Sequence, residues 1–174
     1  NLKTFEEAGI DLTDYVNKNR KTGYYKLPLM LIYKILPNPK EGEKPAPDAP
    51  AIGWIIPVNG YGLWDAIYGY LAIESNGDTV IGISWYEQKE TPGLGAEITA
   101  KWWQDQFPGK LIFEQGPGGK TDFESAPLGL TVVRGQVQNV IGDKPKAKSA
   151  VDGIPGATLT GNGVTQAFKD DLAP

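Results

Sequence analysis

The chain has 174 residues, of which 40% are hydrophobic and 22% charged, the size and composition of one globular domain. Its formal net charge of −4 argues against a nucleic-acid surface built from clustered lysine and arginine. Cysteine and histidine are both absent, which excludes disulfides, thiol and Ser-His-Asp catalysis and most zinc sites. We therefore expect neither a metal nor nucleic acid as a ligand. No run of 18 apolar residues could span a bilayer, so we expect the chain itself to be soluble.

The N-terminal part of the sequence predicts a segment that leads into the main domain. Residues 1–36 combine a charged, weakly helical start, in which Thr13 is available as an N-cap, with an apolar run over 27–36 that predicts a buried strand. Residues 37–50 are rich in proline and charge and predict a solvated loop. We assign residues 51–174 to the main domain.

Six short segments rich in aromatic or β-branched residues predict strands. They cover residues 52–58, 67–75, 78–87, 110–115, 130–135 and 137–143. The turn Asn76-Gly77-Asp78 predicts a hairpin, because an Asn-Gly pair adopts positive φ at little cost. Strands outnumber helices and the hairpins are antiparallel, so the predicted class is α+β: a single domain with a mostly antiparallel sheet flanked by helices.

A helix is predicted over residues 98–109, where Pro108 and Gly109 would end it. Within it, Trp102 and Trp103 lie about 100° apart around the helix axis and cannot share a face. We expect both rings to serve the core. The alternative is that one of them is exposed and meets another subunit.

The stretch DGIPGATLTGNG, residues 152–163, has four glycines and precedes an amphipathic helix over 161–174 with Asn162 as its N-cap. Free amides in such a turn and at the helix start could bind a phosphate group. A plain turn remains the alternative reading of the composition. The stretch is not a P-loop, because no lysine follows the glycines at the required spacing.

Three segments together resemble motifs of the FMN-binding domain family, and most closely the family formed by the C subunits of Na⁺-translocating NADH:quinone oxidoreductases. They are GYGLWD at 60–65, ETPGLG at 90–95 and DGIPGAT at 152–158, in the family's order. The similarity runs from about residue 57 to residue 172, and Pro155 stands where the family usually has serine or threonine. The G subunit of the related Rnf electron-transport complex is less similar, because it usually lacks the Leu-Trp pair of the first motif.

The resemblance implies that a separate flavin transferase attaches FMN covalently, through a phosphoester, to Thr158. It also implies that the ETPGLG loop lies against the flavin ring, with Thr91 and Leu94 as the foremost contacts. The full set of cofactor-binding residues expected is Thr158, Asp152, Gly156, Ala157, Leu159, Thr160, Trp64, Leu63, Thr91, Gly93 and Leu94. No catalytic residue is expected. Glu90 and Glu97 could form a hydrolase pair, but we expect both carboxylates to be solvated.

The implied function is that of a flavin electron carrier, the redox subunit of a membrane complex that couples NADH oxidation and quinone reduction to Na⁺ export. Its partners would be the other subunits of that complex. The domain would face the periplasm, held at the inner membrane by a single N-terminal helix that would precede residue 1. A different class of function is a secreted module that binds carbohydrate on the faces of its five tryptophans.

Overall fold

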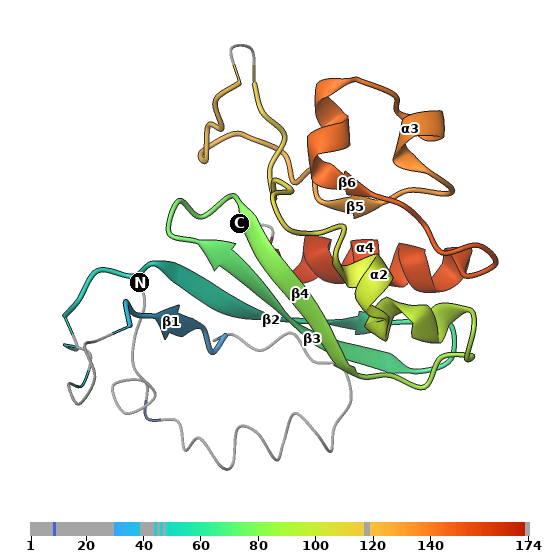
Figure 1. Cartoon of the computed structure of the whole chain (residues 1–174), viewed down its shortest axis with the longest axis horizontal. Coiled ribbons are helices and arrows are strands. Elements are labelled where there is room, and N and C mark those ends of the chain that lie inside the picture. Colours follow the sequence, from blue (N-terminus) through green and yellow to red (C-terminus); the bar gives the residue numbers. More distant parts are fainter. Residues whose placement is uncertain are drawn as a thin grey trace.

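The structure is a computed structural model that describes residue 9 and residues 30–38, 44, 46, 48–116 and 119–172. Its central feature is a four-stranded antiparallel sheet with the strand order β1-β2-β3-β4 (Figure 1). The strands are β1 (Tyr33–Ile35), β2 (Gly53–Tyr61), β3 (Ala66–Glu74) and β4 (Val80–Glu87). The three longer strands agree with the sequence prediction to within a few residues at each end.

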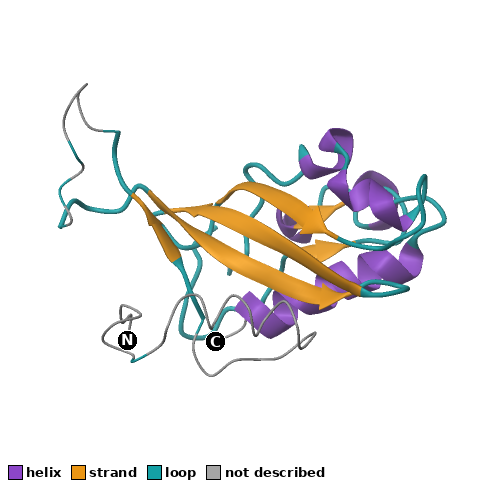
Figure 2. Ribbon diagram, turned by 90° about the horizontal axis from the view of Figure 1, so that it is seen from below, coloured by secondary structure: helices purple, strands orange, loops and turns teal. Residues whose placement is uncertain are grey.

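The remaining elements follow the sheet in the chain and include one long helix. They are η1 (Gly95–Thr99), α2 (Lys101–Gln104), β5 (Thr131–Val132), α3 (Val137–Val140), η2 (Pro145–Ser149), β6 (Ala150–Val151) and α4 (Thr158–Leu172). Helix α4 lies along one face of the sheet, where it packs on β2, and it also contacts β5 (Figure 2). The α+β class with a mostly antiparallel sheet is therefore confirmed. Only the short β5–β6 pair is parallel among the strands of the described residues.

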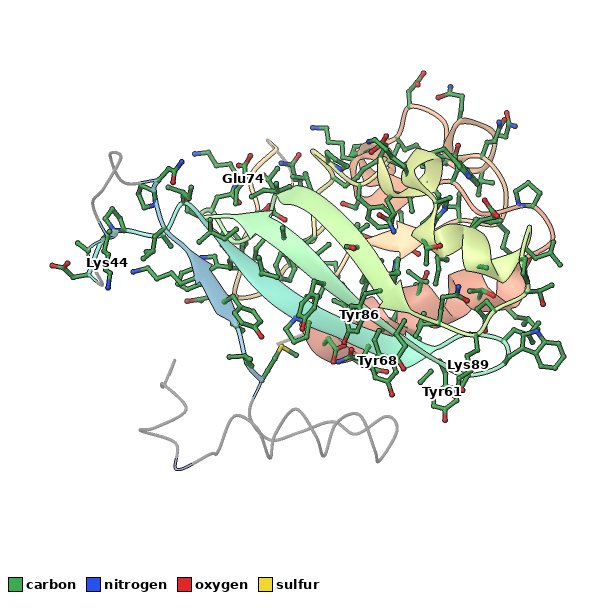
Figure 3. All side chains as sticks on the ribbon, turned by 60° about the horizontal axis from the view of Figure 1, so that its bottom comes forward. Lys44, Tyr61, Tyr68, Glu74, Tyr86 and Lys89 are labelled. Carbon is green, nitrogen blue, oxygen red and sulfur yellow. The ribbon has the colours of Figure 1, made fainter. Side chains whose placement is uncertain are left out.

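The hydrophobic core lies between the sheet and α4, and it follows from the two-residue period of the strands. On β3, Ile67 and Leu71 point inward and are fully buried, whereas the alternate residues Tyr68 and Tyr70 lie on the opposite face. Figure 3 shows Tyr68 on that outer face. On the inner side, the ring of Phe168 from α4 lies 6.5 Å from the ring of Trp85 on β4. Helix α4 is thus fixed to the sheet by its apolar face.

The predicted hairpin turn after β3 is confirmed. Gly77 has φ of 76°, the left-handed region that favours glycine. The Asn76 side-chain oxygen accepts hydrogen bonds from the amides of Asp78 and Thr79, both at 2.9 Å. The local sequence is sufficient to specify this turn, since each partner lies within three residues.

Three strand predictions, over 27–36, 110–115 and 130–135, are wrong in extent; of the last, only β5 (Thr131–Val132) is a strand. The run over 27–36 was expected to form a buried strand, but its described part forms only β1, at the sheet edge, where Tyr33 is 43% exposed. An edge strand pairs on one side only, and α4 covers β2 instead. Residues 110–115 form only isolated bridges, Thr79 with Leu111 and Phe113 with Leu128. The helix expected near Thr13 lies outside the described residues.

Residues 137–143 were predicted as a strand but contain helix α3. The Asp152 side chain accepts a 2.7 Å hydrogen bond from the Val137 amide and so caps the helix start. Gly142, with φ of 67°, follows the helix end. The prediction failed because the capping carboxylate lies 15 residues away in the sequence.

The two predicted helices are also altered. Residues 98–109 fall partly in η1 and partly in the short α2, where Trp103 is fully buried but Trp102 is 52% exposed. A core role for both tryptophans is therefore wrong. The C-terminal helix begins at Thr158, four residues before the expected cap Asn162. Among the described residues, no helix has the length and apolar character needed to cross a bilayer.

Candidate functional site

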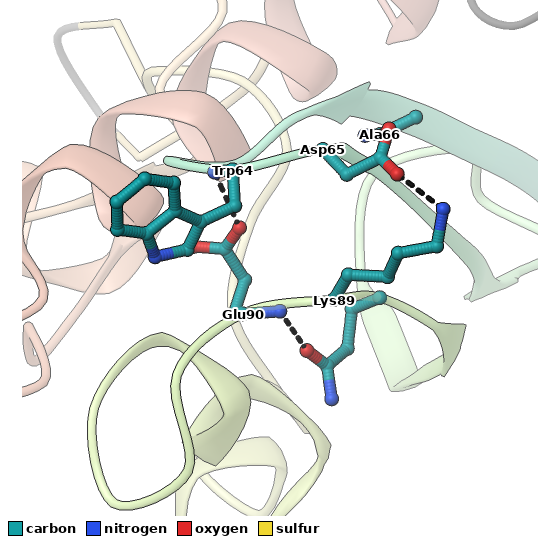
Figure 4. Close-up of polar contacts among 6 residues, drawn as sticks. Trp64, Asp65, Ala66, Lys89 and Glu90 are labelled. Carbon is teal, nitrogen blue, oxygen red and sulfur yellow. Dashed lines mark hydrogen bonds and ion pairs between the residues drawn. The ribbon is translucent and has the colours of Figure 1, made fainter.

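The carboxylate of Glu90 joins the three motifs singled out in the sequence. Its Oε1 accepts a hydrogen bond from the Trp64 amide at 2.9 Å (Figure 4). Its Oε2 accepts one from the Leu63 amide at 2.9 Å and one from the Thr160 hydroxyl at 2.5 Å. Glu90 is only 6% exposed. The β2–β3 turn, the ETPGLG loop and the first turn of α4 therefore meet at one buried side chain.

This meeting point is closely packed because glycine occupies two of its positions. A Cβ atom on Gly62 would lie 2.5 Å from the Glu90 carboxyl carbon. A Cβ atom on Gly95 would lie 2.5 Å from the Thr160 hydroxyl oxygen. Real Cβ atoms do not approach other heavy atoms so closely, so both motifs need glycine there. Glycine is thus needed at these two positions because the Glu90 side chain and the Thr160 hydroxyl occupy the space that a Cβ atom would take.

Glu90 is ionised in this environment. Burial raises the pKa of its carboxyl group. The hydrogen bonds from Thr160, Trp64 and Leu63 lower this pKa, and their combined effect is larger than that of burial, so the pKa lies below the ordinary value for glutamate. The expectation that Glu90 is solvated is therefore wrong. The prediction failed because Glu90 is buried by contacts with residues up to 70 positions away in the chain, which no local sequence pattern reveals.

An exposed ion pair beside Glu90 joins Asp65 of the GYGLWD motif to Lys89, which directly precedes the ETPGLG loop. The Lys89 ammonium lies 2.5 Å from Oδ2 of Asp65 (Figure 4). The hydrogen bond from Lys89 lowers the pKa of the Asp65 carboxyl, and a second one from the Ala66 amide acts in the same direction. Because both side chains are exposed, this pair contributes little to stability compared with the buried network.

Four large apolar side chains are exposed around the three motifs, and we call them the apolar patch. They are Leu63, Trp64, Leu94 and Leu159. Trp64 is 67% exposed, and its indole Nε1 donates a 3.1 Å hydrogen bond to the Thr91 hydroxyl. Leu94 Cδ2 lies 2.8 Å from the position that a Cβ on Gly156 would take, so this side chain reaches the DGIPGATLTGNG stretch. The apolar patch is suited to cover a flat apolar ring.

Thr158 is the first residue of α4, and its side chain is exposed. The Ala157 carbonyl accepts the Gly161 amide at 3.0 Å, which begins the ladder of helix hydrogen bonds at this turn. The amides of the first turn have no acceptor within the helix and, together with the helix dipole, favour an anion. Gly156, with φ of 78°, makes the turn that precedes them.

A small hollow beside Thr158 is lined by Arg134, Gly135, Gly153 and Asn162, among others. Arg134 is the only arginine among the described residues, is exposed, and forms no ion pair with any of them. A guanidinium group matches the geometry of a phosphate. Arg134 is absent from the predicted site residues, because residues 132–135 reach the DGIPGATLTGNG stretch only through the tertiary fold: the Gly153 amide donates to the Gly135 carbonyl at 2.8 Å.

The other predicted site residues have various positions. Asp152 is used internally: besides capping α3, its carbonyl accepts the Trp103 indole N–H at 2.8 Å and its amide donates to the Gln106 side chain at 2.8 Å. Ala157 and Thr160 are buried. Gly93, with φ of 74°, forms the exposed tip of its loop. The structure thus brings the motifs together, with some of these residues supporting the site from beneath and others facing outward.

The described residues contain no group of three or more carboxylates that could hold a metal ion. Glu97 is the second carboxylate considered for acid-base chemistry. It accepts a 3.1 Å hydrogen bond from the exposed Trp102 indole and is not one of the residues hydrogen-bonded to Glu90. Around Thr158 the site combines an exposed residue at a helix start, the guanidinium group of Arg134 beside it and the apolar patch.

The family comparison identifies residues 62–173 as an FMN-binding domain. The chain is 51% identical over 177 residues to the C subunit of the "Na(+)-translocating NADH-quinone reductase" of Chlamydia caviae, an alignment that covers 98% of this chain and 56% of that protein. The chain thus spans about half the length of the curated relatives it matches.

Two crystal structures are similar to this fold. The C subunit of the Na(+)-translocating NADH-quinone reductase from Parabacteroides distasonis matches with a TM-score of 0.55 and 32% identity, over 69% of this chain and 53% of that one. Shewanella oneidensis NqrC matches with a TM-score of 0.57 and 30% identity, over 79% of this chain and 52% of that one. The family resemblance inferred from the three motifs is confirmed, and the chain belongs to the FMN-binding domain family.

Proposed function

We propose that this chain carries FMN covalently on Thr158 and acts as a flavin electron carrier, the C subunit of a Na⁺-translocating NADH:quinone oxidoreductase. The observation that carries the proposal is the position of Thr158: its exposed hydroxyl begins α4, and Thr160 two residues later is tied through Glu90 to the motif that holds Trp64. The proposed attachment site and Trp64 of the apolar patch are therefore linked through one hydrogen-bonded network.

The residues present fit the two chemical halves of FMN. The phosphate half needs positive potential and donors, which Arg134 and the first-turn amides of α4 offer beside Thr158. The isoalloxazine half needs apolar surface with a few polar partners, which Leu94, Trp64 and the Thr91 hydroxyl offer. When bound, FMN supplies the one-electron redox chemistry, and the chain's residues position it.

The site has no means of activating Thr158 by itself. Among the described residues, no carboxylate or amine hydrogen-bonds the Thr158 hydroxyl, and the nearby Glu90 is fully engaged by Leu63, Trp64 and Thr160. The proposal therefore includes a separate flavin transferase that forms the phosphoester. The chain's part is to present an unhindered hydroxyl at a helix start, where the phosphate is favoured.

The curated relatives bear the name of one subunit of a larger reductase, so we extend the proposal to its other subunits as partners. The complex would couple NADH oxidation and quinone reduction to Na⁺ export, with this domain on the periplasmic side of the inner membrane and one N-terminal helix as its anchor. The exposed Trp102 on α2 is available as a contact for a partner subunit.

The arrangement of tryptophans does not favour the carbohydrate-binding alternative. Trp85 and Trp103 are buried and Trp54 is partly buried against the core. Trp64 and Trp102 are exposed, but they lie in different parts of the chain, the β2–β3 turn and α2, and each is hydrogen-bonded to its own partner, Thr91 and Glu97 respectively. A sugar platform needs aromatic faces side by side.

The test is co-expression of the chain with a flavin transferase, followed by intact-mass measurement and fragmentation. We expect an added mass of one FMN less water on Thr158. Thr158→Val keeps the side-chain shape without the hydroxyl and should abolish the adduct while leaving the fold intact, because the residue is exposed. Thr158→Ser keeps a hydroxyl and is the matched control, expected to be modified. An unmodified wild-type chain alongside an active transferase would refute the proposal.

A further inference from the structure

We infer that Glu90 is a positioning residue for the flavin, which holds the apolar patch and the attachment hydroxyl in one fixed relation through its charged carboxylate. The inference rests on the proposed function and deepens it. Glu90 does not reach the exposed surface and so acts through other residues. Three donors from two distant segments converge on it, at Leu63, Trp64 and Thr160.

The network requires a carboxylate and not merely a polar side chain. The Leu63 and Trp64 amides can only donate, and a carboxylate can only accept. An amide side chain at position 90 would place its NH₂ group where Oε1 or Oε2 now stands. An NH₂ group at the Oε1 position would face the Trp64 amide, and one at the Oε2 position would face the Leu63 amide. Either way one backbone N–H of the turn loses its acceptor.

The close packing leaves no room for another group to replace the lost acceptor. Gly62 and Gly95 bring backbone against the Glu90 side chain on two sides, so closely that even a methyl group would overlap there. A turn that loses its acceptor must therefore move outward to reach water. Trp64 would move with it, together with its hydrogen bond to Thr91.

The geometric consequence concerns the flavin ring more than its attachment. Thr158 is exposed and presented by α4, whose Phe168 and Val164 are fully buried, so the hydroxyl remains available when the β2–β3 turn shifts. The ring contacts on the apolar patch would not keep their place, since Trp64 lies on that turn. Loss of the Glu90 charge should thus separate attachment, which persists, from ring positioning, which is lost.

The experiment compares Glu90→Gln, Glu90→Asp and Glu97→Gln in the full chain, each co-expressed with a flavin transferase. Glu97→Gln removes the same charge nearby but lies outside the network and serves as the control. Intact mass gives the FMN content, and flavin fluorescence yield and midpoint potential report on the ring. We expect Glu90→Gln to retain the adduct on Thr158 with a higher fluorescence yield and an upward shift of potential, because a buried negative charge disfavours reduction of the flavin.

Glu90→Asp keeps a carboxylate, so its fluorescence yield and potential should lie between those of Glu90→Gln and the wild type. Glu97→Gln should match the wild type in both. If Glu90→Gln does not fold, Thr160→Val removes one of the three donors but keeps the Glu90 charge, so it should raise the fluorescence yield by less and not raise the potential. Wild-type fluorescence and potential in a fully modified Glu90→Gln chain, or wild-type fluorescence in a fully modified Thr160→Val chain, would overturn the inference alone. A wild-type chain that gains no FMN would overturn the inference together with the proposed function.

Discussion

The contact between α4 and the end of β2 depends on the absence of a side chain at Gly163, and Gly163→Ala tests this. A Cβ atom there would overlap the carbonyl oxygen of Tyr61 and lie 2.9 Å from its carbonyl carbon. The obstacle is backbone at the start of the GYGLWD motif, so it cannot rotate away. Either α4 or the strand end must shift.

The size of the effect follows from two opposing terms. Overpacking against a well-packed neighbour costs about 1–3 kcal/mol, and the upper value applies here because the neighbour is backbone. Replacement of glycine by alanine within a helix returns up to about 1 kcal/mol. The net loss is about 2 kcal/mol. For a chain of this length, about 2–4 °C of Tm is lost per kcal/mol, so we expect Tm to fall by about 4–8 °C.

Thermal unfolding followed by circular dichroism measures the effect, with Gly161→Ala as the matched control on the same helix. A Cβ atom on Gly161 would meet only a methyl group, Cγ1 of Val132 at 3.2 Å, which can move by a few tenths of an ångström. The control should therefore keep its Tm or gain slightly. A Tm of Gly163→Ala at or above that of Gly161→Ala would refute the overlap with Tyr61 as the limit on this contact.

Two further outcomes are expected. Leu94→Ala should change the flavin absorbance spectrum or potential of the loaded chain without preventing attachment, because Leu94 reaches Gly156 but does not carry the hydroxyl proposed to bind FMN. An unchanged spectrum and potential would remove Leu94 from the ring contacts. Because the pKa of Glu90 is lowered in the fold, its contribution to stability should be complete above the ordinary glutamate pKa of about 4.5 and be lost as pH falls below it. The free energy of unfolding, measured with urea between pH 7 and pH 3, should fall with pH in the wild type and fall less in Glu90→Gln. An equal fall in both proteins would contradict this assignment of the pH dependence to Glu90.

The sheet and its hairpin could be predicted because their determinants are local. Along β3 the buried residues alternate with tyrosines, so the period itself identifies a strand with one covered face. The turn after β3 is specified by Asn76 and Gly77, whose partners lie within three residues. The three functional motifs could be found from sequence for the same reason, because each is a short continuous segment.

The parts that could not be predicted depend on contacts between distant residues. Val137 begins a helix and not a strand because Asp152 caps it. Glu90 is buried and ionised because it accepts hydrogen bonds from Leu63, Trp64 and Thr160, which lie in two distant segments of the chain. Arg134 lies beside the DGIPGATLTGNG stretch only through the pairing of residues 131–135 with 150–153. In each case the local pattern allowed two structures and the tertiary fold selected one.

The start of α4 at Thr158 and not at Asn162 has a direct consequence for function. Successive residues of a helix are rotated by about 100°, so Thr158 and Thr160 lie about 200° apart and face opposite ways. Thr158 is exposed, and Thr160 is buried against Glu90. In the proposed function, a single helical turn therefore presents one hydroxyl for attachment and uses the other to fix its own orientation. Had the helix begun at Asn162, both threonines would lie in a loop, and the proposed phosphoester on Thr158 would have neither the first-turn amides of a helix nor the buried Thr160 anchor beside it.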